Sequence, residues 1–197
     1  IIAIPFGINL KKFKENPGIE AEFPSLFHIG AMNWMPNEEG IRWFLDNVWL
    51  QVNKRFPNLK FYLAGREMPE WLCHCKLPNV VVVGEVDDAF DFMYSKAVEI
   101  VPLFSGSGIR IKIIEGMAAS RAVISTSIGA EGIEVSHGKN ILVANTPEEF
   151  IVAIGRCVND QPFCVQLGRN ARQLIETNHS NQVLMKKLVA FYEQIIS

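Results

Sequence analysis

The chain alternates short apolar segments with longer stretches in which apolar residues recur at helical spacing. The short segments are continuous runs of β-branched and aromatic residues, which are typical of parallel strands buried on both faces. The expected strands are Leu26–Gly30, Leu59–Ala64, Val80–Val83, Glu99–Leu103, Ala122–Thr126 and Asn140–Val143. The expected helices between them are Asn37–Phe56, Met68–Cys75, Ala89–Ser95 and Ile109–Ser120. This alternation predicts an α/β fold with a doubly wound, six-stranded parallel sheet.

The alternation ends after Val143, and the rest of the chain has helical character. Thr146-Pro147-Glu148-Glu149 combines an N-cap residue, an early proline and acidic residues, as helix starts do. The expected C-terminal helices run to about Asn159, over roughly Pro162–Thr177 and over Asn181–Ile196. The first residues are rich in proline and glycine and lack a helical period. We therefore divide the chain into an entry segment and interdomain connection at 1–24, a Rossmann-like domain at 25–178 and a C-terminal helix at 179–197.

Composition narrows the classes of protein that fit this pattern. The 197 residues are 49% hydrophobic and 20% charged, with a net charge of −2, so a full core is expected and a general nucleic-acid binder is not. The apolar runs are too short to span a bilayer, and the start Ile-Ile-Ala-Ile-Pro does not resemble a secretory signal. The four cysteines include one tight cluster, Cys73-His74-Cys75, with no second cluster to complete a metal site. We expect free or structural thiols and a cytoplasmic location.

The densest chemical signal lies between Pro102 and Val135. An expected strand ends at Leu103, the small-residue loop Ser105–Gly108 follows, and a helix is expected to begin near Ile109. Glycines allow backbone amides to approach a ligand closely, and a helix N-terminus presents unpaired N–H groups, so this turn predicts a phosphate site.

Charged side chains accompany that turn. Arg110 and Lys112 place cations beside the loop. If the helix begins at Ile109, Gly108, Lys112 and Glu115 share one stripe, which suits Glu115 to accept hydrogen bonds from ribose hydroxyls. The alternative is an ordinary strand–helix turn with solvated charges. His28 lies within an expected strand and is interpreted as a hydrogen-bonded core residue.

Several segments together resemble the donor-binding domain of GT-B glycosyltransferases, the large retaining family with a Glu–seven residues–Glu signature. The similar segments follow family order over nearly the whole chain: Ile4–Asn9, Phe27–Asn37, Phe61–Arg66, Val83–Asp88, Pro102–Met117 and Gly129–Gly132. The resemblance implies that the domain at 25–178 binds a nucleotide sugar and forms one half of a GT-B fold.

The resemblance also assigns roles to positions. Glu115 matches the second signature glutamate, which bonds the nucleotide ribose in the family. The residues that match the base-contacting loop are Gly84, Glu85 and Val86, and those that match the diphosphate and sugar contacts are Gly106, Ser107, Gly108 and Ile109. The secondary candidates are Gly30, Asn33 and Glu131.

Two departures from the family pattern change the expected site. Ser107 stands at the first signature glutamate, so a donor-sugar contact differs. A basic pair found in the loop after the first strand of many members is replaced here by residues near Ala31 and Glu39. We expect Arg110 and Lys112 to supply the missing positive charge to the diphosphate.

The function implied by the resemblance is transfer of a sugar from a nucleoside-diphosphate sugar, with retention. The expected partners are the donor and an N-terminal acceptor-binding domain of the same protein, with catalysis between the two domains. The catalytic residues are unassigned, no metal or other cofactor is required, and membrane contact is at most peripheral, through that N-terminal domain. We expect the isolated domain to be inactive. The alternatives are a sugar-nucleotide epimerase or a non-catalytic nucleotide-binding module.

Overall fold

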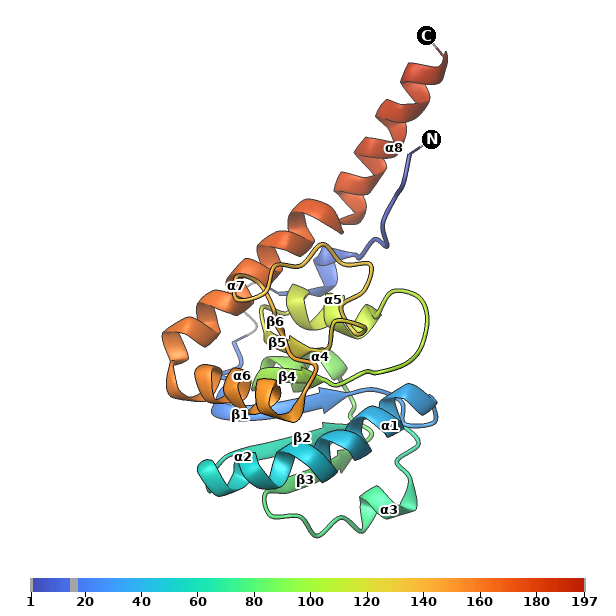
Figure 1. Ribbon diagram of the computed structural model, residues 1–197. Coiled ribbons are helices and arrows are strands. Elements are labelled where there is room, and N and C mark those ends of the chain that lie inside the picture. The colour runs from blue at the N-terminus through green and yellow to red at the C-terminus, as the bar shows by residue number, and fades with distance from the viewer. Residues whose placement is uncertain (1, 15–17, 197) are drawn as a thin grey trace.

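The computed structural model describes residues 2–14 and 18–196, so the expected entry segment at 1–24 lies partly outside the described residues. Its core is one parallel sheet of six strands, as the sequence predicts (Figure 1). The strands are β1 (Glu22–Ile29), β2 (Lys60–Ala64), β3 (Val80–Gly84), β4 (Lys96–Val101), β5 (Ala122–Ser125) and β6 (Leu142–Val143). The strand order β3-β2-β1-β4-β5-β6 is that of a doubly wound sheet, and the winding reverses between β1 and β4.

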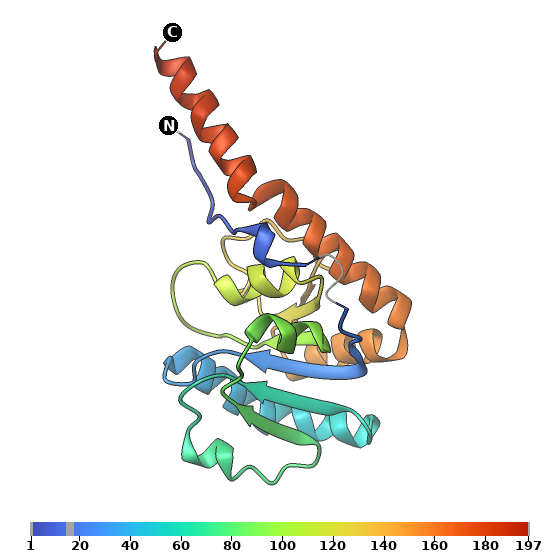
Figure 2. The same ribbon diagram turned by 180° about the vertical axis from the view of Figure 1, so that it is seen from behind.

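Helices cover both faces of the sheet (Figures 1 and 2). They are η1 (Leu10–Lys12), α1 (Met35–Phe44), the π-helical turn η2 (Leu45–Trp49), α2 (Leu50–Arg55), α3 (Glu70–Cys73), α4 (Ala89–Tyr94), α5 (Ile111–Ala118), α6 (Pro147–Asn159), α7 (Gln161–Asn178) and α8 (Asn181–Ile196). One buried cluster joins the sheet to α1, η2, α2 and α6, and the other joins it to α4 and α5, while α7 contributes to both. Helix α8 extends away from this body beside the N-terminal segment (Figure 2).

Several element boundaries differ from those expected. Strands β1 and β4 begin earlier, at Glu22 and Lys96, because these charged residues pair with each other across the two strands. The long helix expected over Asn37–Phe56 is interrupted by the π-helical turn η2. Helix α5 begins at Ile111 and not at Ile109, because the preceding Arg110 has non-helical backbone angles. The spacing of apolar residues does not report ion pairs, π-helical turns or the backbone angles of single residues, so it could not predict these boundaries.

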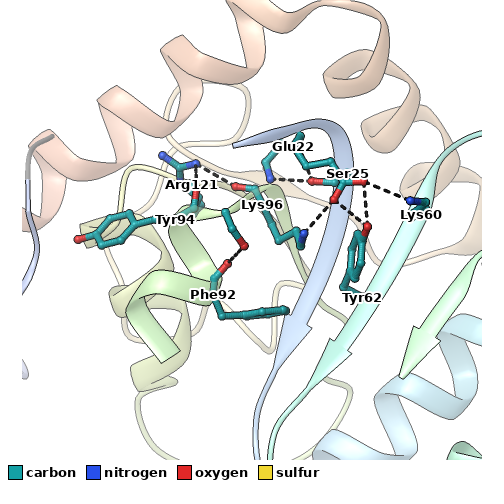
Figure 3. A network of polar contacts seen from close by, with 10 residues as sticks. Glu22, Ser25, Lys60, Tyr62, Phe92, Tyr94, Lys96 and Arg121 are labelled. Atoms are coloured by element: carbon teal, nitrogen blue, oxygen red, sulfur yellow. Dashed lines mark hydrogen bonds and ion pairs between the residues drawn. The ribbon is translucent and has the colours of Figure 1, made fainter. Parts of the chain in front are cut away.

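A polar network closes the amino edge of the sheet (Figure 3). The Glu22 carboxylate accepts hydrogen bonds from the Tyr62 hydroxyl at 2.7 and 2.9 Å and from Nζ of Lys96 at 2.8 Å. Arg121 donates to the carbonyls of Tyr94 and Lys96 on the same side. These contacts fix the start of β1 against β2 and β4, and they leave the opposite, carboxyl edge to the loops.

We predict that Glu22→Gln lowers stability only while Glu22 is ionised. Burial alone would raise the pKa of this carboxyl, but hydrogen bonds from Lys96 and Tyr62 and the charges of Lys96 and Lys60 outweigh burial and lower it. A lowered folded-state pKa adds stability above the unfolded value, and this stability is lost as the pH falls through the folded value. The carboxylate is partly exposed, so the loss in unfolding free energy is below about 1 kcal/mol.

Urea unfolding at neutral and acidic pH measures this difference. Lys96→Gln should reproduce much of the loss, whereas Lys60→Gln should have little effect, because the Lys60 ammonium lies 3.9 Å from the carboxylate and its side chain is 51% exposed. A deficit of equal size at both pH values would mean that Glu22 acts through packing and not through its charge.

Candidate functional site

Loops from neighbouring strands meet at the carboxyl edge of the sheet. Gly30, directly after β1, donates from its amide to the Ala64 carbonyl at the end of β2, at 3.1 Å. Gly65 lies against the backbone of Gly30 so closely that a side chain at 65 would collide with the Gly30 carbonyl. Parallel sheets bind ligands beyond their carboxyl ends where the winding reverses. A ligand is therefore expected at the switch point between β1 and β4.

The loop between β4 and α5 presents free backbone amides at this edge. Gly106 and Gly108 have φ angles of +103° and +81°, which favour glycine, and residues 106–108 are exposed. Within the described part of the chain, the amides of residues 106–109 donate no hydrogen bond. A turn of unpaired amides before a helix is suited to bind an anion.

Arg110 shapes this loop from inside. Its guanidinium donates to the carbonyls of Gly106, at 2.8 Å, and Gly108, and it lies 5.9 Å from the ring centre of the half-exposed Trp34. Only 4% of Arg110 is exposed. The structure thus uses Arg110 to hold the loop, while its Nε has no hydrogen-bond partner among the described residues. Because α5 begins after Arg110, the expected helical stripe loses Gly108 and keeps Lys112 and Glu115.

The Lys112 side chain reaches from α5 to the switch point. Its Nζ donates to Oδ1 of Asn37 at 2.6 Å and contacts Nε2 of His28 at 3.2 Å. A side chain at Gly30 would collide with this ammonium, so Lys112 lies directly against the start of the loop after β1. Lys112 therefore brings positive charge to the loop in which the sequence lacks a basic pair.

The neighbours of Lys112 determine which N–H groups of its ammonium are hydrogen-bonded. Nδ1 of His28 lies 2.8 Å from the Ile100 carbonyl, which can only accept, so Nδ1 carries the proton and Nε2 accepts from Lys112. Burial and the charge of Lys112 hold the pKa of His28 well below its usual value. His28 is thus a hydrogen-bonded core residue, as the sequence predicts. Two N–H groups of Lys112 face His28 and Asn37, and the third has no acceptor among the described residues.

Asn37 is a site residue that sequence reasoning missed. It is 3% exposed at the start of α1, where its Nδ2 donates to the Ala31 carbonyl at 2.8 Å while its Oδ1 accepts from Lys112. One side chain thereby joins the loop after β1 to the ammonium. The only sequence signal is an asparagine beside Pro36, which also fits an ordinary helix start.

Glu115 lies one turn further along α5 and is half-buried. Burial raises the pKa of its carboxyl, and the charges of Lys112 and Lys12 oppose that rise. Among the described residues, no donor is hydrogen-bonded to its side chain. It is therefore free to accept hydrogen bonds from ligand hydroxyls.

Glu99 is a second residue that sequence reasoning missed, because it lies inside a segment interpreted as a buried strand. The side chain is fully buried in β4, and neither carboxylate oxygen has a hydrogen-bond partner within the described chain. Its carboxyl lies against Gly116 of α5, where any side chain would collide with it. Burial raises the pKa of Glu99, with Lys112 opposing and Glu115 adding to the rise.

The remaining candidates lie around the same edge. Gly84 ends β3 with φ +77°, and its carbonyl accepts from Gly65 at 2.8 Å, which connects the Gly84–Val86 turn to Gly30 through Gly65. In that turn Glu85 is exposed and Val86 half-buried. Gly132 lies near Ile109, so the exposed Glu131 is next to the glycine loop. Asn33 is exposed, without a side-chain hydrogen bond among the described residues.

The four cysteines are free thiols. None of the described residues forms a cluster of three or more His, Cys, Asp or Glu that could hold a metal ion. No described helix has both the length and the apolar character that crossing a bilayer would require.

A doubly wound parallel sheet with this strand order defines a Rossmann-like α/β domain. A family model for glycosyl transferases group 1 matches residues 23–160, and the chain belongs to this family. It is 24% identical to the capsular polysaccharide biosynthesis glycosyltransferase CapM of Staphylococcus aureus, covering 96% of this chain and 53% of CapM. The chain spans about half the length of the curated relatives it matches.

Solved structures share the fold. A glycosyltransferase from Rickettsia africae superposes with a TM-score of 0.76 at 17% identity, covering the whole of this chain and 57% of its own. Anabaena Alr3699/HepE, crystallised with UDP and glucose, superposes with a TM-score of 0.69 at 15% identity, covering 95% of this chain and 55% of its own. The fold is thus that of one half of a GT-B glycosyltransferase.

We predict that Glu99→Met stabilises the chain. Methionine keeps the length of the side chain and removes an unpaired buried carboxyl, which adds about 1–3 kcal/mol to the unfolding free energy. Because the folded-state pKa of Glu99 is raised, the part of the gain that depends on its charge is absent below the unfolded value of about 4.3, grows as the pH rises from there to the folded value, and is constant above it. Thermal unfolding over this pH range tests it, with the exposed Glu193→Met as control. A destabilised Glu99→Met variant at neutral pH would show that Glu99 has a partner in the fold.

Proposed function

We propose that this chain binds a nucleoside-diphosphate sugar at the carboxyl edge of its sheet and is the donor-binding half of a glycosyltransferase. One observation carries the proposal: the Lys112 ammonium, held by His28 and Asn37, retains an uncommitted N–H at the switch point where the free amides of residues 106–109 also lie. Amides and an ammonium together suit the two phosphates of such a donor.

Each part of the site has a role in this proposal. The amides of residues 106–109 and the Lys112 ammonium bind the diphosphate, and Ser107 lies next to the donor sugar. The Glu115 carboxylate accepts from the ribose hydroxyls, and the backbone of the Gly84–Val86 turn meets the base. Gly30 leaves room for the Lys112 ammonium, because it lacks a side chain.

These residues would also assist the reaction. When the bond between the sugar and the terminal phosphate oxygen breaks, negative charge grows on the departing diphosphate. Amides and an ammonium that are already in place stabilise this charge without reorganising at the moment of reaction. In this proposal the transfer retains configuration, needs no metal ion and takes place in the cytoplasm, and a second domain supplies the acceptor and the remaining catalytic residues. The isolated chain is then inactive.

The similar proteins support this assignment. CapM is named as a glycosyltransferase of capsular polysaccharide biosynthesis, and Alr3699/HepE was crystallised with UDP and with UDP-glucose. Calorimetry of the chain with nucleoside diphosphates tests it. Half of the donor environment is absent, so we expect weak binding of about −4 to −6 kcal/mol, which corresponds to millimolar to high micromolar dissociation constants. No heat with any nucleoside diphosphate at millimolar concentration would contradict the proposal.

We predict that Lys112→Met and Glu115→Gln weaken binding in different ways. Lys112→Met should reduce affinity for a nucleoside diphosphate by roughly ten- to hundredfold while leaving the bare nucleoside nearly unaffected, since a charge-assisted hydrogen bond contributes about 1.5–3 kcal/mol. Glu115→Gln should weaken nucleoside and diphosphate about equally, because both carry the ribose.

The exposed Lys139→Met is the matched control for loss of a positive charge, and should bind as the unmodified chain does. Equal losses of nucleoside and diphosphate affinity in Lys112→Met would remove the phosphate role. Unfolding of Glu115→Gln would make Glu115 a structural residue.

A further inference from the structure

Glu99 lies in the middle of the sheet, on the face that α5 covers. Its register neighbours are Phe27 of β1 and Val123 of β5, so apolar side chains flank it on both sides. The carboxyl extends to α5 and fits there only because residue 116 is glycine. A carboxyl with two unpaired oxygens in such a place reduces stability, and groups of this kind persist where they serve a function.

The position of Gly116 relates the Glu99 carboxyl to Lys112. Lys112 and Gly116 are four residues apart on α5 and therefore share one face of the helix, about one turn apart. The Glu99 carboxyl thus lies beneath the stretch of helix from which the Lys112 side chain extends to the switch point. The charges of Glu99 and Lys112 act on each other in the folded chain.

The other charged groups around Glu99 are few. Besides Lys112, helix α5 contributes Glu115, and Lys12 of the N-terminal segment acts on Glu115. Strand β1 contributes His28, which is held neutral, and β5 contains no titratable residue. Among the described residues, the direct contacts of the Lys112 ammonium are the neutral Asn37 and His28, and the negative charges that raise its pKa are those of Glu99 and Glu115.

We propose that Glu99 is a positioning residue for donor binding: its buried carboxyl keeps the Lys112 ammonium charged and directed to the diphosphate. The inference rests on the proposed function. In the empty site, an ionised Glu99 favours the ammonium form of Lys112.

The charge of Lys112 sets the direction of the pH dependence. Burial lowers the pKa of Lys112, and the charges of Glu99 and Glu115 raise it. The ammonium is present below this pKa, so diphosphate affinity falls as the pH rises through it. Without the charge of Glu99 the pKa of Lys112 is lower, and the fall in affinity begins at a lower pH.

The first test needs no ligand. Side-chain NMR titration of the Lys112 ε-methylene in the unmodified chain, Glu99→Gln and Glu99→Asp measures the pKa of Lys112 directly. We expect Glu99→Gln to lower this pKa and Glu99→Asp, which restores the charge, to recover part of the difference. The exposed Glu193→Gln is the control and should leave it unchanged. An unchanged Lys112 pKa in Glu99→Gln would overturn the proposal, and Glu99→Met serves in its place if the glutamine variant does not fold.

The second test follows UDP affinity from about pH 6 to about pH 11, a range that includes the ordinary lysine pKa of about 10.4 near its upper end. Curves for the unmodified chain and Glu99→Gln should coincide at the acidic end and separate as the pH rises, by up to about tenfold for each unit by which the Lys112 pKa is lowered. A uniform loss at every pH would mean that Glu99 only supports the fold, and would overturn the proposal. If the unmodified chain binds no nucleotide, the proposed function fails, and the ligand-free titration still decides whether Glu99 sets the charge of Lys112.

Discussion

The candidate site depends on one contact, in which the Lys112 ammonium bridges His28 and Asn37 at the point where the sheet reverses its winding. This contact joins α5 to β1 and α1, although α5 lies far from both of them in the sequence. It also accounts for Gly30, since a side chain at that position would displace the ammonium. Positive charge at this edge therefore comes from a helix on the far side of the switch point and is available to the loop after β1.

The two edges of the sheet use polar groups differently. At the amino edge, Glu22 and Arg121 bond to several partners and close the ends of the strands. At the carboxyl edge, the amides of residues 106–109 donate no hydrogen bond within the described chain. Exposed backbone amides of this kind, before the start of a helix, are suited to bind an anion.

The sequence predicted the sheet well, because buried parallel strands are continuous apolar runs and the glycine loop has a local signature. The roles of Lys112 and Glu115 in binding a donor stay predictions, and the sequence did not indicate the contacts that these side chains make. Arg110 illustrates the reason: its sequence neighbours suggested a free cation, whereas the non-helical turn directs it into the loop carbonyls. Asn37 and Glu99 contact elements that lie far from them in the sequence. Asn37 and Lys112, for example, are 75 residues apart, and no local sequence pattern can predict a contact over that separation.

We propose that a nucleoside diphosphate binds between the glycine loop and Lys112. The most direct measurement is amide NMR of the chain titrated with UDP, which reports every backbone position at once. We expect the largest shifts at residues 106–109 and Gly30, smaller shifts at Gly84–Val86, and none at the amino edge around Glu22 and Lys96. Shifts centred on the amino edge, or spread evenly over the surface, would contradict it.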